Sequence, residues 1–111
     1  MEADRGRIVV VTAGFALWVG GRCAAAARFS DIRRLHVVRP AGGGPDALAL
    51  RVELTDGSLM ELHHAAPGFA LFVERARTTL KGMTPAADWP TTLAAVPDAG
   101  SALVFEKPKG W

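Results

Sequence analysis

Apolar and polar residues alternate along much of the first 64 residues, which is the period of a strand with one buried and one exposed face. β-Branched and aromatic residues fill these segments, and glycine-containing turns separate them. The pattern predicts four short strands followed by a hairpin, at 7–11, 15–21, 22–29, 32–38 and 47–64. Gly20 and Gly21 predict a tight turn between the second and third strands.

The third predicted strand carries mainly small side chains. Alternation places Cys23, Ala25, Ala27 and Phe29 on one face. We expect Cys23 to be a small buried side chain rather than a reactive thiol. Because alanines supply little bulk, we also expect something large to pack over this strand.

The hairpin at 47–64 has an Asp-Gly turn signal that allows two loop lengths. A two-residue loop at Asp56 and Gly57 would place charged residues opposite apolar ones on both faces. A three-residue loop that begins at Thr55 matches apolar with apolar residues and joins opposite charges. We therefore expect the longer loop, with Gly57 in the left-handed conformation. The expected pairs are Leu50 with Leu62, Val52 with Met60, and Arg51 with Glu61.

A helix is predicted at about 67–81, immediately after the hairpin. Pro67 suits the first helical position, where its missing N–H costs nothing. Gly82 is placed to end the helix. Apolar residues recur at the helical spacing and form one face: Phe69, Phe72, Val73, Ala76 and Leu80.

The remaining residues, 83–111, are expected to be an irregular extension of a single domain, 1–111, whose core is 7–82. Pro85, Pro90 and Pro97 prevent a long helix there. A short strand is predicted at about 101–106. Trp89 is expected to fill a gap between the helix and the sheet.

Composition narrows the class of protein. The chain is 50% hydrophobic and 22% charged, as one globular domain of 111 residues would be. Its formal net charge of +2 is too small to indicate a polyanion, so we expect no nucleic-acid partner. One cysteine, Cys23, cannot form an intrachain disulfide, which favours the cytoplasm.

The apolar run from Ile8 to Val19 is shorter than the ~20 residues that a membrane-spanning helix needs, so no membrane span is expected. Arg5 and Arg7 precede this run and small residues follow it, which is the outline of a signal peptide. Two acidic residues at positions 2 and 4 and the Gly14 break oppose that alternative.

Two adjacent histidines, His63 and His64, end the predicted hairpin. Neighbouring strand residues point to opposite faces, which would place His64 inward and His63 outward, so the two could not share a metal ion. A zinc site needs three or four ligands, and the only other strong candidates are His36 and Cys23. We expect no metal site, and packing or backbone hydrogen bonding at the strand end instead.

Catalytic motifs are weak throughout. No serine sits in a nucleophile elbow, and the glycines at 42–44 lack the Lys-Ser or Lys-Thr of a phosphate-binding loop. We therefore expect a protein that is not an enzyme and binds no cofactor. The rival hypothesis is a small enzyme in which His36 or His64 lines a cleft beside a carboxylate such as Glu61.

Ten of the thirteen basic residues are arginine, and four of them form the one basic cluster in the sequence: Arg28, Arg33, Arg34 and Arg39. Guanidinium groups bind phosphate, so the cluster is a candidate anion site for a phosphate or a lipid headgroup. The competing interpretation is a solvated strand surface with acidic partners nearby. Alternation predicts that Arg33 and Arg34 point to opposite faces.

Several short antiparallel strands followed by the helix segment "PGFALFVERARTTLKG" resemble the bacterial pleckstrin-homology-like (PH-like) domains. Phe29, Ser30, Asp31 and Ile32 also look like the entry to the fourth strand of such domains. The resemblance implies a strongly bent sheet closed by a helix, over about residues 7–82. The 29 residues after the helix depart from it, and the first turn, "TAGF", lacks the basic residues of phosphoinositide-binding members. It therefore implies the fold and not phosphoinositide recognition.

We expect an α+β protein: a strongly bent antiparallel sheet or split barrel of six or seven strands, closed by one amphipathic helix. The expected function is a small non-enzymatic binding or scaffold module. Its partner would be another protein or a second copy, so a homo-oligomer is one outcome. The anionic-ligand binder and the small enzyme remain as alternatives.

Overall fold

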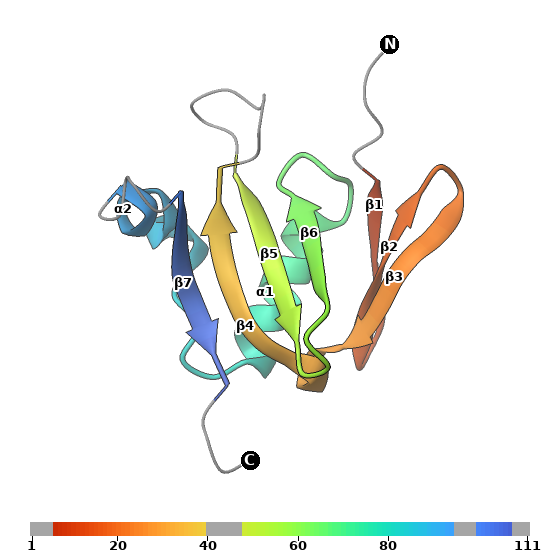
Figure 1. The fold of residues 1–111 in the computed structure, drawn as a ribbon, viewed down its shortest axis with the longest axis horizontal. Coiled ribbons are helices and arrows are strands. Elements are labelled where there is room, and N and C mark those ends of the chain that lie inside the picture. Colours follow the sequence, from red (N-terminus) through yellow and green to blue (C-terminus); the bar gives the residue numbers. More distant parts are fainter. Residues whose placement is uncertain (1–5, 40–47, 95–99, 108–111) are drawn as a thin grey trace.

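The described residues form seven strands in two antiparallel sheets, together with a few short helices (Figure 1). The computed structural model describes residues 6–39, 48–94 and 100–107. The expected class, α+β with antiparallel sheets, is confirmed. Residues 1–5, on which the signal-peptide alternative depends, lie outside the described residues, as do the glycines at 42–44 and Pro97.

The two sheets follow each other along the chain, except for the last strand. The first sheet has the order β1-β2-β3, with β1 Arg7–Val10, β2 Gly14–Val19 and β3 Arg22–Arg28. A 3₁₀ turn, η1 Phe29–Asp31, leads into the second sheet. That sheet has the order β6-β5-β4-β7, with β4 Ile32–Val38, β5 Ala49–Leu54, β6 Leu59–His63 and β7 Ser101–Glu106.

The β5–β6 hairpin has the predicted register. Leu50 lies opposite Leu62, Val52 opposite Met60, and Arg51 opposite Glu61. The loop is the expected three-residue one, because the Leu54 N–H donates to the Ser58 carbonyl at 2.9 Å. Gly57 takes the left-handed conformation at φ 88°.

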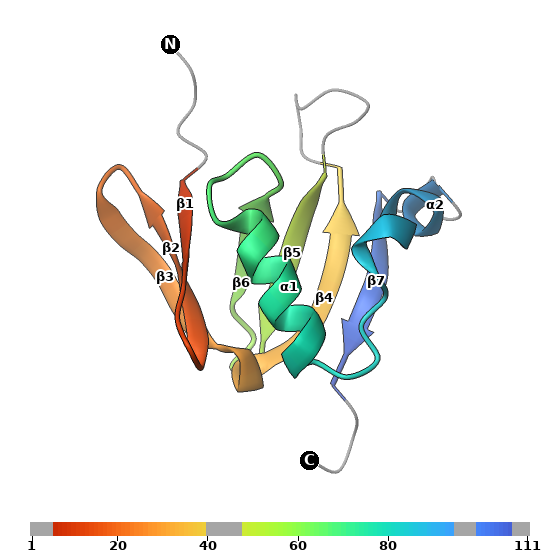
Figure 2. The ribbon, with the colours of Figure 1, turned by 180° about the vertical axis from the view of Figure 1, so that it is seen from behind.

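Helix α1, Phe69–Thr79, fills the angle between the two sheets (Figure 2). Phe72, Ala76 and Leu80 are buried, as the apolar spacing predicted. The predicted start at Pro67 is wrong. The N-cap is Gly68 at φ 90°, and Pro67 belongs to the turn before it.

That turn is docked on the first sheet, which explains the shifted helix start. The Ile8 N–H donates to the Pro67 carbonyl at 2.8 Å. A Cβ at Gly68 would lie 1.9 Å from the Ile8 carbonyl oxygen, so only glycine fits this left-handed contact.

Three phenylalanines join the two sheets and the helix in one core. Phe15 comes from β2, Phe29 from η1 and Phe72 from α1. Ring centroids of Phe15 and Phe72 lie 4.8 Å apart, and those of Phe15 and Phe29 lie 5.3 Å apart. Such tilted and edge-on contacts are favourable geometries for aromatic pairs.

The residues after α1 belong to the same core. The expected last strand is present as β7, which pairs with β4 and buries Val104 and Phe105. Trp89 is buried as expected, with its ring edge against Phe69 and its indole N–H donating to the Thr84 carbonyl at 2.9 Å.

A short helix in this part, α2 Trp89–Ala94, preceded by a 3₁₀ turn, η2 Ala86–Asp88, was not predicted. Pro90 lies in the first turn of α2, where a helix tolerates proline. Among the described residues, no helix has the length and apolar character needed to cross a membrane.

Candidate functional site

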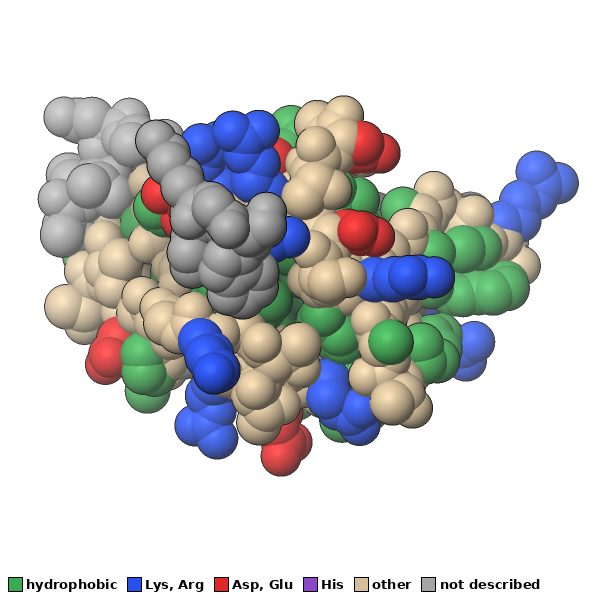
Figure 3. Space-filling view, turned by 90° about the horizontal axis from the view of Figure 1, so that it is seen from below, with side chains coloured by type: hydrophobic (Ala, Val, Ile, Leu, Met, Phe, Trp, Pro, Cys, Tyr) green, Lys and Arg blue, Asp and Glu red, His purple; other side chains and the backbone are tan. Residues whose placement is uncertain are grey.

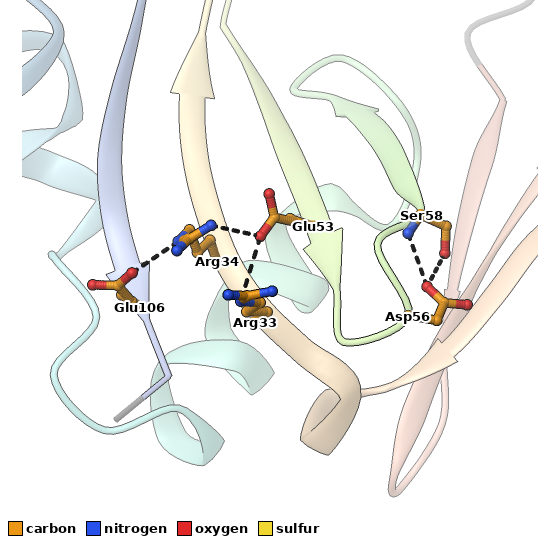
Figure 4. Close-up of polar contacts among 6 residues, drawn as sticks. All are labelled: Arg33, Arg34, Glu53, Asp56, Ser58 and Glu106. Atoms are coloured by element: carbon orange, nitrogen blue, oxygen red, sulfur yellow. Dashed lines mark hydrogen bonds and ion pairs between the residues drawn. The ribbon is translucent and has the colours of Figure 1, made fainter. Parts of the chain in front are cut away.

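Two of the four candidate arginines are already paired with acidic side chains (Figure 4). Arg34 donates to Glu53 at 2.9 Å and to Glu106 at 2.8 Å. The Arg33 Nε lies 3.8 Å from the same Glu53 carboxylate. The hydrogen bond with Glu106 and the charge of Glu53 raise the pKa of Arg34 above its ordinary value. The predicted opposite facing of Arg33 and Arg34 is wrong, because the β4 register shifts between Ile32 and Arg34.

The other two arginines lie elsewhere. Arg28 ends β3, and Arg39 follows the far end of β4, where its N–H donates to the Gly100 carbonyl at 3.4 Å. Arg39 lies six positions along the chain from Arg33, which is about 20 Å in a strand. The structure therefore brings together Arg33 and Arg34 alone, and their charges are largely compensated.

His63 and His64 are stacked, with ring centroids 4.9 Å apart. The predicted inward position of His64 is wrong: β6 ends at His63, the chain turns, and His64 is exposed. The expected backbone bonding is present. The His64 Nδ1 lies 2.8 Å from the Leu48 carbonyl oxygen, and the His63 Nδ1 accepts from the Ala65 N–H at 3.1 Å. Within the described ranges, no three potential metal ligands gather.

His36 lies on the outer face of β4, opposite Arg51 on β5 and Leu103 on β7. Partial burial lowers its pKa below the ordinary value, and the charges of Arg51 and Arg34 act in the same direction while Glu53 opposes them. Two hollows on the surface are described below, and neither His36 nor His64 lines them.

Cys23 is exposed, which contradicts the predicted burial. The cause is a bulge. The β2–β3 register passes from Leu17 with Ala25 to Trp18 with Cys23, so Ala24 has no partner on β2. The alternation that would bury Cys23 is broken at that residue.

A first hollow, of about 470 Å³, lies between α1 and the segment after it. Its apolar lining includes Phe69, Val73, Met83 and Pro85. Glu74 and Arg77 are its charged residues. Among the described residues, its lining holds no histidine, no cysteine and no cluster of one charge, and it offers mainly apolar contact.

The second hollow, also about 470 Å³, lies on the three-stranded sheet (Figure 3 shows this end of the molecule at the right). Val9, Val11, Ala16 and Ala26 are among its lining residues, with Arg28 and Asp31 as its charged residues. Trp18 lies on the same outward face, opposite Arg7 of β1. We call Val9, Val11, Ala16, Trp18 and Ala26 the apolar sheet face.

Side chains on the apolar sheet face are unusually exposed for their type. Val11 is 58% and Trp18 37% exposed. Ala24 and Ala26 are exposed too. The large side chains expected over the alanine-rich strand therefore lie only on its inner face, where Ala25 and Ala27 pack against the core. The sequence signal for this surface was the same alternation, because the outward positions of the three strands are apolar or small except at their ends, where Arg7 and Arg28 stand.

In comparisons with known proteins, no protein-family model, no curated protein and no solved structure matches the chain. Its function is therefore argued from its own geometry.

Proposed function

We propose that this protein is a small non-enzymatic module that binds another protein through the apolar sheet face. The observation that supports it most is the outward, exposed position of Val11, which lines the 470 Å³ hollow, and of Trp18, which lies further along the same face. Contiguous exposed apolar surface is typical of interaction sites, because covering it releases water from apolar groups. An exposed tryptophan such as Trp18 is a frequent anchor of binding energy.

The finer fold belongs to the same proposal. We propose that the two sheets and α1 form the strongly bent, helix-closed arrangement of the bacterial PH-like domains. The order of elements up to α1 supports it, as does the position of α1 between the sheets. A cytoplasmic location fits the single, unbridged cysteine.

The two alternatives have less support. An anion site would need several uncompensated guanidinium groups at one place, whereas Arg33 and Arg34 share Glu53 and lie far from Arg39. The enzyme hypothesis needs His36 or His64 in a cleft beside a carboxylate, and neither histidine lines the two hollows described above.

Site-specific photo-crosslinking in the cells that naturally produce the protein tests the proposal. A photoreactive residue would replace Val11 in one variant and Leu59 in a matched control. Leu59 is 61% exposed on the four-stranded sheet, so the two positions differ in surface and not in accessibility. We expect a discrete protein adduct from position 11 that Ala16→Asp abolishes, and none from position 59. Equal labelling at both positions, or no adduct at either, would contradict the proposed function.

A further inference from the structure

β3 is an open edge of the three-stranded sheet, and Figures 1 and 2 place it at one end of the molecule. It pairs with β2 on one side, so alternate N–H and C=O groups on its other side point away from the sheet. These groups are hydrogen-bonding positions for one further strand.

Two of the other three edges, β1 and β7, are partly covered by neighbouring segments. β1 lies beside the turn after β6, to which the Ile8 N–H donates. At β7, helix α2 lies beside the start of the strand (Figure 1). Natural proteins usually protect open edges with inward charges, lysine or proline. The interior of β3, Cys23 to Ala27, has none of these, and its one irregularity is the bulge at Ala24.

Charge decides what could pair with this edge. Arg22 and Arg28 stand at the two ends of the alanine run, and both are exposed. Among the residues that the structure describes, neither has a carboxylate within ion-pair distance, whereas Arg33 and Arg34 do. A second copy paired antiparallel about Ala25 would set Arg22 against Arg28 at both ends, which is unfavourable. A strand with acidic residues at its ends would be favourable at both.

We infer that β3 binds an extended segment of the partner protein as a fourth strand, with small or β-branched residues in its middle and Asp or Glu at both ends. The inference rests on the proposed function and specifies the partner's chemistry. Backbone hydrogen bonds to β3 supply general affinity in this mode, and the flanking charges supply specificity. The outward side chains of the added strand would extend the apolar sheet face beyond Ala26.

Fluorescence anisotropy with a labelled peptide, Asp-Val-Thr-Val-Thr-Val-Asp, tests this on the full chain. We expect it to bind about tenfold more tightly than the same peptide ended with lysines, given two ion pairs of modest strength and the repulsion that replaces them. The double variant Arg22→Glu/Arg28→Glu should reverse that preference. The control Arg77→Glu/Lys81→Glu makes the same charge change at exposed positions on and after α1, and it should leave the preference unaltered.

N-methylated peptides separate strand addition from charge attraction alone. An added strand directs only every second N–H toward β3. Methylating one alternate set of amides should therefore abolish binding, and methylating the other set should preserve it. Equal effects of both sets would overturn the inference.

The outcomes also separate this inference from the proposed function. A position-11 adduct in cells together with no peptide binding would overturn strand addition while the binding module stands. Absence of both would overturn the two together. A concentration-dependent dimer in light scattering that Arg28→Glu strengthens would assign the edge to a second copy and overturn the partner peptide.

Discussion

The outer faces of the two sheets present different kinds of side chain to water. On the four-stranded sheet, Arg34 bridges three strands by bonding Glu53 on β5 and Glu106 on β7 from its place on β4. At the centre of that outer face the polar groups satisfy each other, although Leu59 and Leu103 on the same face are 61% and 45% exposed. On the three-stranded sheet the outward positions between Arg7 and Arg28 are mainly valine, alanine and tryptophan, such as Val9 and Trp18. A face that leaves apolar groups in water gains free energy when something covers it.

The largest test of the comparison removes part of the four-stranded sheet. A chain ending at Thr84 lacks β7, and β4 becomes an edge. It also loses buried Trp89 and Phe105 from the core. We expect this chain to lack a cooperative thermal transition in circular dichroism. A well-folded monomer would show instead that the residues up to α1 are sufficient for the fold.

Coupling between the sheets is tested by Phe72→Ala. Phe72 contacts Phe15 and Phe29 and is fully buried, so its truncation should lower the free energy of unfolding by about 3–5 kcal/mol. Leu71→Ala is the control, because Leu71 is 47% exposed on the same helix and should cost much less. Urea unfolding measures both. Similar costs would mean that the aromatic cluster does not join the sheets.

The docked turn is a smaller and sharper test. Gly68→Ala meets the Ile8 carbonyl at a left-handed φ, and it should cost roughly 1–3 kcal/mol. Gly82→Ala has a similar φ of 85° with nothing within 4 Å, so it should carry only the conformational cost of about 1 kcal/mol. If the two variants unfold at the same urea concentration, β1 does not hold this turn.

Two features of the fold were predictable from the sequence. The β5–β6 register was predictable because apolar matching and the Arg51–Glu61 pair agreed with the turn chemistry at Gly57. The helix face was predictable for a similar reason, since Phe72 and Ala76 follow one clear period.

Bulges account for most of the site errors. One residue out of register exposes Cys23, and another lets Arg33 and Arg34 reach the same Glu53 carboxylate. No residue type marks either position, because a bulge depends on the partner strand and on twist. The pairing of Arg34 with Glu106 was not predictable from the sequence either, because no residue near Glu106 indicates that β7 lies beside β4.

Removing a charge from one outer face should cost more free energy of unfolding than adding a polar group to the other. Glu53→Gln leaves Arg33 and Arg34 with weaker partners and should cost roughly 0.5–1 kcal/mol, because the pairs are partly exposed. Val11→Ser should change the free energy of unfolding by less than about 0.5 kcal/mol, since Val11 is a surface residue. A larger loss at Val11 would make the apolar sheet face part of the fold rather than a contact surface.

The smallest effect concerns acid. Burial lowers the pKa of His36 below 6.5 in the folded chain, so the unfolded chain binds more protons just below that pH. The contribution of His36 to the free energy of unfolding is therefore complete above pH 6.5. It declines as the pH falls toward the lowered pKa that His36 has in the folded chain. In urea unfolding, the free energy of unfolding of His36→Gln should decline less between pH 7 and 5 than that of the parent chain. The same measurement at pH 8 gives the cost of the substitution that does not depend on pH. An unchanged slope would contradict the assignment.

Amide hydrogen exchange compares the two sheets most directly, in the purified protein and in an extract of the cells that produce it. The account predicts that amides of β1, β2 and β3 become protected in the extract, with β3 changing most, while β5 and β6 exchange as in the purified protein. Protection confined to the four-stranded sheet, or no difference between the two conditions, would contradict a contact surface on the apolar sheet face.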